Sequence, residues 1–169
     1  MPAPVVGTYP AYFEKYIKLV VVDNIDEAIS QYSKSFEEFF SDISEEKSSF
    51  RYSKDKWSLK ELLQHVTDTE RIFAFRALSI SRGEKNPLPG FDENSYVVES
   101  GADSRSWKSI LEEFIAVRKS TDLLLKSFNN YHLNKSGTTN GQPNTVNAVS
   151  YIIFGHILHS INIVKERYL

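Results

Sequence analysis

Hydrophobic residues recur every three or four positions along four long stretches of the chain, the spacing of one face of a helix. The first stretch begins near Asp23 or Asn24. Its apolar positions are Ile25, Ala28, Ile29, Tyr32, Phe36, Phe39, Phe40 and Ile43. The second follows Ser58, whose spacing from Glu61 is that of a capping box, and Gly83 can end it. Its buried face is expected to hold Leu59, Leu62, Leu63, Val66, Phe73 and Ala77.

The other two periodic stretches lie in the second half of the chain. The third begins near Ser104 or Ser106, and its inward positions are Trp107, Ile110, Leu111, Phe114, Leu124 and Leu125. Asn144 or Thr145 can cap the fourth, which runs to the last residues through Tyr151, Ile152, Phe154, Ile157, Leu158 and Ile161. The segment YHLNKSGTTNGQPN before it carries two glycines and a proline, so it is expected to be a loop.

Four long amphipathic helices without a repeated strand pattern predict an all-α fold, a four-helix bundle. A short extra helix is expected before them, from Pro10 through Tyr16. Val97–Val98 and Leu19–Val22 resemble strands but are too short to build a sheet. A chain of 169 residues that is 41% hydrophobic can bury a sizeable core, so we expect one domain over residues 1–169.

Charge and cysteine content narrow the classes of function. Twenty Lys and Arg residues against 22 Asp and Glu residues give a net charge of −2, so neither nucleic acid nor an anionic membrane is an expected partner. The chain has no cysteine, which excludes disulfides, thiolate ligands and a cysteine nucleophile. No signal-peptide pattern precedes Leu19, and we therefore expect a cytoplasmic location.

Three of the four histidines fall inside predicted helices. His65 lies in the second long helix, and His156 and His159 lie three residues apart on one face of the last. Bundles build metal sites from side chains that project inward from facing helices, and three histidines leave an open position for water or substrate. A single helical histidine is more often a core or surface residue with a hydrogen-bonded ring. His132, in the polar loop, is expected to be solvated.

The chain also resembles a known family. The segments KWSLKELLQHVTDTERIFAFRALSISRG, LPGFDENSYV and NGQPNTVNAVSYIIFGHILHSINIVKERYL, in this order, resemble the DinB/YfiT-like superfamily over nearly the whole length. That family has a four-helix-bundle fold, in agreement with the periodicity. The resemblance implies a divalent metal, nickel or zinc, held by three histidines.

The implied ligands can be placed on this sequence. His65 occupies the position of the first histidine and His156 that of the second, whereas Ser160 stands where the third is usual. A neutral hydroxyl is a poor ligand beside imidazole. Two outcomes follow: His159 replaces the missing ligand, or the site has lost it and binds metal weakly or not at all.

Other residues are expected to support the site. Asp68 lies about one turn beyond His65 and Glu70 nearly a turn and a half beyond it, and Asp68 is the better placed to orient the ring or accept a proton. The simpler interpretation of both carboxylates is an ion pair with Arg71 at the surface or edge of the bundle. Arg167 and Tyr168 are expected to close the bundle. An aromatic set is expected to form core and pocket wall: Phe73, Phe75, Phe91, Tyr96 and Tyr151.

The resemblance implies three functional hypotheses. The first is a metal-dependent transferase in which a low-molecular-weight thiol attacks a small electrophilic substrate, with His159 or Asp68 as proton acceptor. The second is a non-catalytic bundle with a degenerate metal site, in a binding or stress-associated role. The third is a metal-dependent hydrolase that uses the same site. Relatives of this kind often form dimers, so a homodimer is expected.

Overall fold

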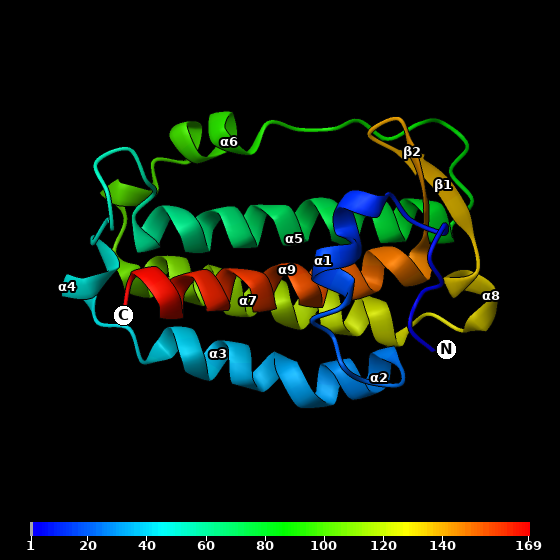
Figure 1. The fold of residues 1–169 in the computed structure, drawn as a ribbon, viewed down its shortest axis with the longest axis horizontal. Coiled ribbons are helices and arrows are strands. Elements are labelled where there is room, and N and C mark those ends of the chain that lie inside the picture. The colour runs from blue at the N-terminus through cyan, green and yellow to red at the C-terminus, as the bar shows by residue number, and fades with distance from the viewer. Residues whose placement is uncertain (1) are drawn as a thin grey trace.

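Four long helical segments lie side by side in the structure, a computed structural model that describes residues 2–169 (Figure 1). The first is a continuous run of α2 (Ile25–Ala28), the π-helical segment η2 (Ile29–Ser33) and α3 (Lys34–Ser41). The other three are α5 (Leu59–Ser81), α7 (Trp107–Lys126) and α9 (Val146–Arg167). The four-helix bundle predicted from the periodicity is therefore confirmed.

Side-chain caps fix where the long helices begin. The Ser58 hydroxyl accepts from the Glu61 N–H, and a Glu61 carboxylate oxygen accepts from the Ser58 N–H at 2.8 Å, so the predicted capping box is formed. Ser106 caps α7, and Thr145 caps α9. Asn24 caps the first run, and Gly83 follows α5 with a φ of 89°. These starts agree with the sequence prediction.

Helix α9 lies at the centre of the core. Its buried side chains extend from Val146 to Val164, and it packs most extensively against α5 and α1 (Glu14–Ile17), the latter preceded by the 3₁₀ turn η1 (Ala11–Phe13). The helix is long and apolar enough to cross a membrane by composition alone, with a mean hydropathy of 1.3. Because 72% of that window is buried against other helices, its apolar character is explained by its central place in the bundle.

Several short elements lie outside the four long helices. They are α4 (Glu45–Ser48), α6 (Glu93–Ser100), η3 (Ala102–Ser104), α8 (Asn130–Leu133), β1 (Ser136–Thr139) and β2 (Gln142–Thr145). Val97, expected to lie in a strand-like run, is instead a buried residue of α6.

The expected loop before α9 contains an antiparallel hairpin. Strands β1 and β2 pair from Ser136 with Thr145 to Thr139 with Gln142. Asn140 and Gly141 form the turn, with φ values of 49° and 72°, as two-residue hairpin turns require. Leu88 pairs with the tip of this hairpin: its N–H donates to the Thr138 carbonyl, and its carbonyl accepts from Asn140. The hairpin thereby covers the segment that leads from α5 to α6.

A close approach of α1 to α9 depends on Gly155. A Cβ added to Gly155 would overlap the carbonyl oxygen of Tyr16 and would lie 2.5 Å from its carbonyl carbon. Helix α1 therefore rests directly on the backbone of α9. The residue after this glycine is His156, so the same contact brings Tyr16 over that histidine.

An ion pair is buried between α5 and α7. Nη1 of Arg118 lies 3.1 Å from Oε1 of Glu70, and both side chains are almost entirely shielded from solvent. Nη2 of Arg118 donates to Asp122 at 2.8 Å, and the guanidinium lies 4.8 Å from the centre of the Phe154 ring. Burial raises the pKa of Glu70, against the opposing charge of Arg118.

We expect Gly155→Ala to lower the free energy of unfolding by about 1–3 kcal/mol, because the added methyl group forces α1 away from α9. Urea denaturation measures the change. Asn162→Ala, at an exposed position of the same helix, serves as the control and should change stability by less than about 0.5 kcal/mol. If Gly155→Ala unfolded at the same urea concentration as the wild type, the contact between α1 and α9 at Gly155 would not be tight.

Arg118→Met should lower the free energy of unfolding by about 3–5 kcal/mol, because it leaves the Glu70 carboxylate buried without its partner. Adding Glu70→Gln should restore part of the loss. Arg71, which pairs with Glu113 and Asp68 at the surface, provides the matched control: Arg71→Met should cost about 1 kcal/mol or less. Equal decreases in the free energy of unfolding for Arg118→Met and Arg71→Met, measured by urea titration, would contradict a stabilising role for the buried Arg118–Glu70 pair.

Candidate functional site

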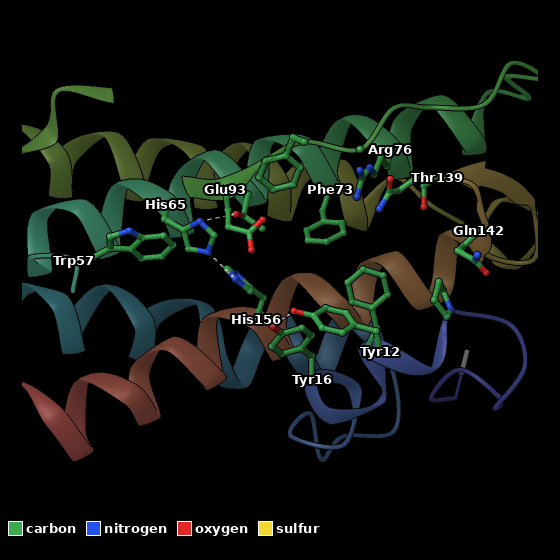
Figure 2. A pocket seen from close by; sticks show the side chains of 16 residues that line it. Tyr12, Tyr16, Trp57, His65, Phe73, Arg76, Glu93, Thr139, Gln142 and His156 are labelled. Atoms are coloured by element: carbon green, nitrogen blue, oxygen red, sulfur yellow. Dashed lines mark hydrogen bonds between the residues drawn. The ribbon is translucent and has the colours of Figure 1, made fainter. Parts of the chain in front are cut away.

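His65 of α5 and His156 of α9 point toward one another between the two helices (Figure 2). Their Nε2 atoms lie 3.2 Å apart, and the ring centres are 5.1 Å apart in an edge-to-face arrangement. His156 is 9% exposed, and His65 is partly buried. Two of the three histidines singled out in the sequence therefore converge on one point.

Neighbouring side chains hold both rings in place. Thr69, one turn beyond His65 on α5, places its Oγ1 3.4 Å from the Nδ1 of His65. The Trp57 ring centre lies 4.8 Å from that of His65. Tyr16 packs edge-to-face on His156, with ring centres 5.6 Å apart. Contacts with Thr69, Trp57 and Tyr16 thus limit the orientation of the two rings.

Burial keeps the two imidazoles neutral. Desolvation lowers the pKa of His65 to about 4, with a small opposing effect from the Glu93 carboxylate. The pKa of His156 is lowered well below its ordinary value, first by desolvation and then by the proximity of His65 and His159. At neutral pH one Nε2 carries a proton and donates it, and the other offers a lone pair. Deprotonated nitrogens at both positions are what a metal ion requires.

The histidine pair fits two ligand positions of a metal ion. Two bonds of about 2.0–2.1 Å at a tetrahedral angle put their nitrogens roughly 3.3 Å apart, close to the observed 3.2 Å. A third ligand is not placed beside them, since within residues 2–169 no group of three or more His, Asp or Glu side chains has metal-binding geometry. The residues therefore fit an ion held by two protein nitrogens, with its other positions open.

Ser160 does not replace the missing ligand. Its hydroxyl donates to the His156 carbonyl at 2.9 Å, within the helix. His159 packs against Tyr16, the residue that also contacts His156, with ring centres 5.2 Å apart. Desolvation and the charge of Lys15 lower the pKa of His159, against an opposing effect of Glu166. His159 is thus a neutral, half-buried imidazole beside the pair.

The Asp68 carboxylate contacts neighbours other than His65. It accepts from Gln64 at 3.0 Å and pairs with Arg71, which also binds Glu113 of α7. The structure therefore shows the surface ion pair that the sequence left open. The group beside the Nδ1 of His65 is Thr69.

Two cavities meet at the histidine pair. The larger, of about 460 Å³, extends from His65 and His156 along α5 toward the β-hairpin. The smaller, of about 330 Å³, extends toward His159 and Tyr168. Four residues line both: Tyr16, Trp57, His65 and His156. The pair is thus reachable from two sides.

The aromatic residues singled out in the sequence divide by position. Phe73 and Phe91 line the larger cavity, Tyr151 is fully buried, and Phe75 and Tyr96 are exposed. At the end of the chain, the Tyr168 hydroxyl donates to the Trp57 carbonyl at 2.7 Å, and the Arg167 guanidinium lies over the Tyr52 ring. Both therefore close the bundle, as expected.

Sequence reasoning missed several residues of the larger cavity, among them Thr69, Arg76 and Glu93. A signal for two of them was present: Thr69 and Arg76 follow His65 by 4 and 11 residues, which places all three on one face of α5. Glu93 comes from α6, beyond the bundle, and its position could not be read from spacing.

In metal-free protein, we expect the His65 ring protons to titrate at about pH 4 in NMR spectra. Because the unfolded chain takes up this proton near pH 6.5, the free energy of unfolding should be highest above that value. It should fall as the pH drops from about 6.5 to about 4. A His65 titration near pH 6.5 would show that the ring is not desolvated.

Comparisons with known proteins agree with this architecture. YfiT from Bacillus subtilis, described as a probable metal-dependent hydrolase with an unusual four-helix bundle topology, has a similar structure. The TM-score is 0.71 and the sequence identity 12%, over 96% of this chain and 89% of that chain, so the likeness shows the fold. Among curated proteins, no significant sequence match was found. The sequence profile of the DinB superfamily matches residues 28–162, and this protein therefore belongs to the DinB superfamily.

Proposed function

We propose that this protein is a metal-dependent transferase in which His65 and His156 hold a divalent nickel or zinc ion. The electrophilic substrate occupies the larger cavity, and a small thiol enters through the smaller one. The 3.2 Å approach of the two Nε2 atoms, at the junction of the two cavities, is the observation that carries the proposal. The description of YfiT as a probable metal-dependent hydrolase supports the metal part of the proposal.

The two cavities favour a reaction of two substrates. Each reaches the histidine pair from its own side, and each is walled by Tyr16 and Trp57. Two reactants can therefore be held against the same point at once, which removes much of the entropic cost of a bimolecular step. Since the chain lacks cysteine, the sulfur nucleophile would arrive with the cosubstrate. A bound divalent metal lowers the pKa of a thiol that reaches it.

Other residues of the protein would orient the histidine rings, accept a proton and exclude water. Thr69 and Trp57 orient the His65 ring, and Tyr16 orients that of His156. His159 lines only the smaller cavity, so its neutral imidazole is the group placed to take the proton of the incoming thiol. The aromatic wall formed by Phe73 and its neighbours excludes water from the substrate.

A hydrolase is the second candidate. The same histidine pair would then act on a substrate in the larger cavity, and water would enter through the smaller one. The description of YfiT as a probable metal-dependent hydrolase favours it. A substrate panel with and without a thiol separates the two reactions.

We expect purified protein reconstituted with nickel or zinc to bind about one ion per chain, because two neutral imidazoles are held at ligand spacing. His65→Ala and His156→Ala should each lower the affinity at least tenfold, by the loss of one of two protein ligands. Elemental analysis after dialysis measures occupancy. His132→Ala, in α8, is the control and should bind as the wild type does. Equal occupancy in all four proteins, or none in the wild type, would favour a degenerate site.

With metal bound, we expect thiol transfer to an electrophile panel and a drop of roughly 10²-fold or more in kcat for His159→Gln, the size typical of a lost general base. The metal content of His159→Gln should match that of the wild type. Turnover of ester or amide substrates without thiol, and none with it, would assign the protein to the hydrolases.

A further inference from the structure

Helix α5 presents one continuous row of side chains to the larger cavity. His65, Thr69, Phe73 and Arg76 all line it and follow one another at intervals of four, four and three residues. That spacing keeps them on one face of the helix. Eleven residues separate the first from the last, which is about 16 Å along the helix axis. The cavity is therefore elongated, with the histidine pair at one end and Arg76 toward the other (Figure 2).

Arg76 is a buried cation without an acidic partner. Arg76 is 4% exposed. Within residues 2–169, no carboxylate lies within ion-pair distance of its guanidinium. Nη2 donates to the Pro89 carbonyl at 2.8 Å, and Nε makes no hydrogen bond. Burial lowers the pKa of Arg76, with no acidic group to oppose it. A guanidinium nevertheless stays charged at neutral pH.

A buried guanidinium without a counter-charge lowers the stability of the folded protein unless an anionic ligand binds to it. An anionic ligand in the cavity would supply the missing partner. The other buried arginine of the bundle shows the contrast, since Arg118 has both Glu70 and Asp122 as partners.

Polar groups surround this end of the cavity. Thr139, Asn140 and Gln142 reach it from the β-hairpin, and Figure 2 shows Thr139 beside Arg76. The Asn140 side chain packs so closely over Gly90 that an added Cβ there would lie 2.7 Å from its Cγ. Glu93, the acidic residue of the cavity lining, lies near His65 instead. The cavity thus carries a positive group at one end and a negative group at the other.

We propose that Arg76 is a substrate-binding residue that pairs with a carboxylate, and that the substrate is an elongated molecule with an apolar or aromatic middle. The Arg76 guanidinium lies 5.2 Å from the centre of the Phe73 ring, so its charge sits about one turn closer to His65 than its backbone does. A carboxylate bound there would lie on the order of 10 Å from the histidine pair. The middle of the substrate would pack on Phe73 and Phe91. This assignment rests on the proposed function, which it deepens by naming the substrate class.

Matched pairs of acids and amides test the assignment. Phenylbutanoate and phenyloctanoate are compared with their neutral primary amides, and inorganic phosphate is included as a simple anion. Dissociation constants are measured by calorimetry on the whole protein. We expect each acid to bind roughly 10- to 100-fold more tightly than its amide, the range for a charge-assisted hydrogen bond. Arg76→Gln should abolish this difference, and Arg76→Lys should retain part of it.

Two control variants separate this site from other effects. Arg82→Gln removes an exposed arginine at the end of the same helix and should leave the preference for acids unchanged. His65→Ala should also keep it, because the carboxylate is bound far from the histidine pair. Loss of metal binding and loss of carboxylate binding are thereby distinguished.

Three results would overturn the assignment. One is equal binding of acids and amides by the wild type, and another is an acid preference that persists in Arg76→Gln. The third is Arg76-dependent binding of phosphate without any preference for the acids. A purely structural role, in which Arg76 only fixes Pro89, would lower the melting temperature of Arg76→Gln without producing an acid preference in the wild type.

Discussion

The close approach of two imidazole nitrogens from separate helices is the interaction on which the site depends. The Nε2 atoms of His65 and His156 lie 3.2 Å apart because α5 and α9 pack along much of their length. Burial keeps both rings neutral, so their nitrogens can approach one another without charge repulsion. Helix α1 packs over His156 through Tyr16. The backbone of α1 can approach α9 this closely because Gly155 has no side chain. Helix packing therefore brings the two nitrogens within hydrogen-bonding distance of one another.

Helix α5 also makes the two ends of the larger cavity chemically different. One face of α5 carries an imidazole at one end of a long cavity and an unpaired guanidinium toward the other. The β-hairpin and the segment around Leu88 close the guanidinium end, whereas α1 and Trp57 enclose the imidazole end. A rigid bundle thus holds two chemically different groups at a fixed separation. If Arg76 binds a carboxylate as we propose, this arrangement would select a substrate by length as well as by charge.

The parts of this structure that could be predicted are those with a local physical signal. The capping box at Ser58 fixed the start of α5, because its partners lie three residues apart. The convergence of His65 with His156 followed from the family resemblance rather than from spacing. By contrast, the hairpin was missed, although Asn140–Gly141 is a typical two-residue turn, because its strands are polar and four residues long.

Residues brought in from outside the bundle were the hardest to foresee. Glu93, at the start of the short helix α6, and Trp57, in the segment before α5, reach the site from outside the four long helices, and only the folded chain places them there. Asp68 shows the opposite error: it lies within one turn of His65, yet its carboxylate meets Arg71 and Gln64 instead of the imidazole. Thr69, one residue later, has the correct angle.

The location of a bound metal ion tests the central claim most directly. Anomalous diffraction from crystals of the zinc- or nickel-loaded protein would show the ion independently of any assumption about its ligands. We expect one peak per chain at about 2.0–2.2 Å from the Nε2 atoms of both His65 and His156. A peak at other residues, or no peak in crystals that contain stoichiometric metal, would contradict it.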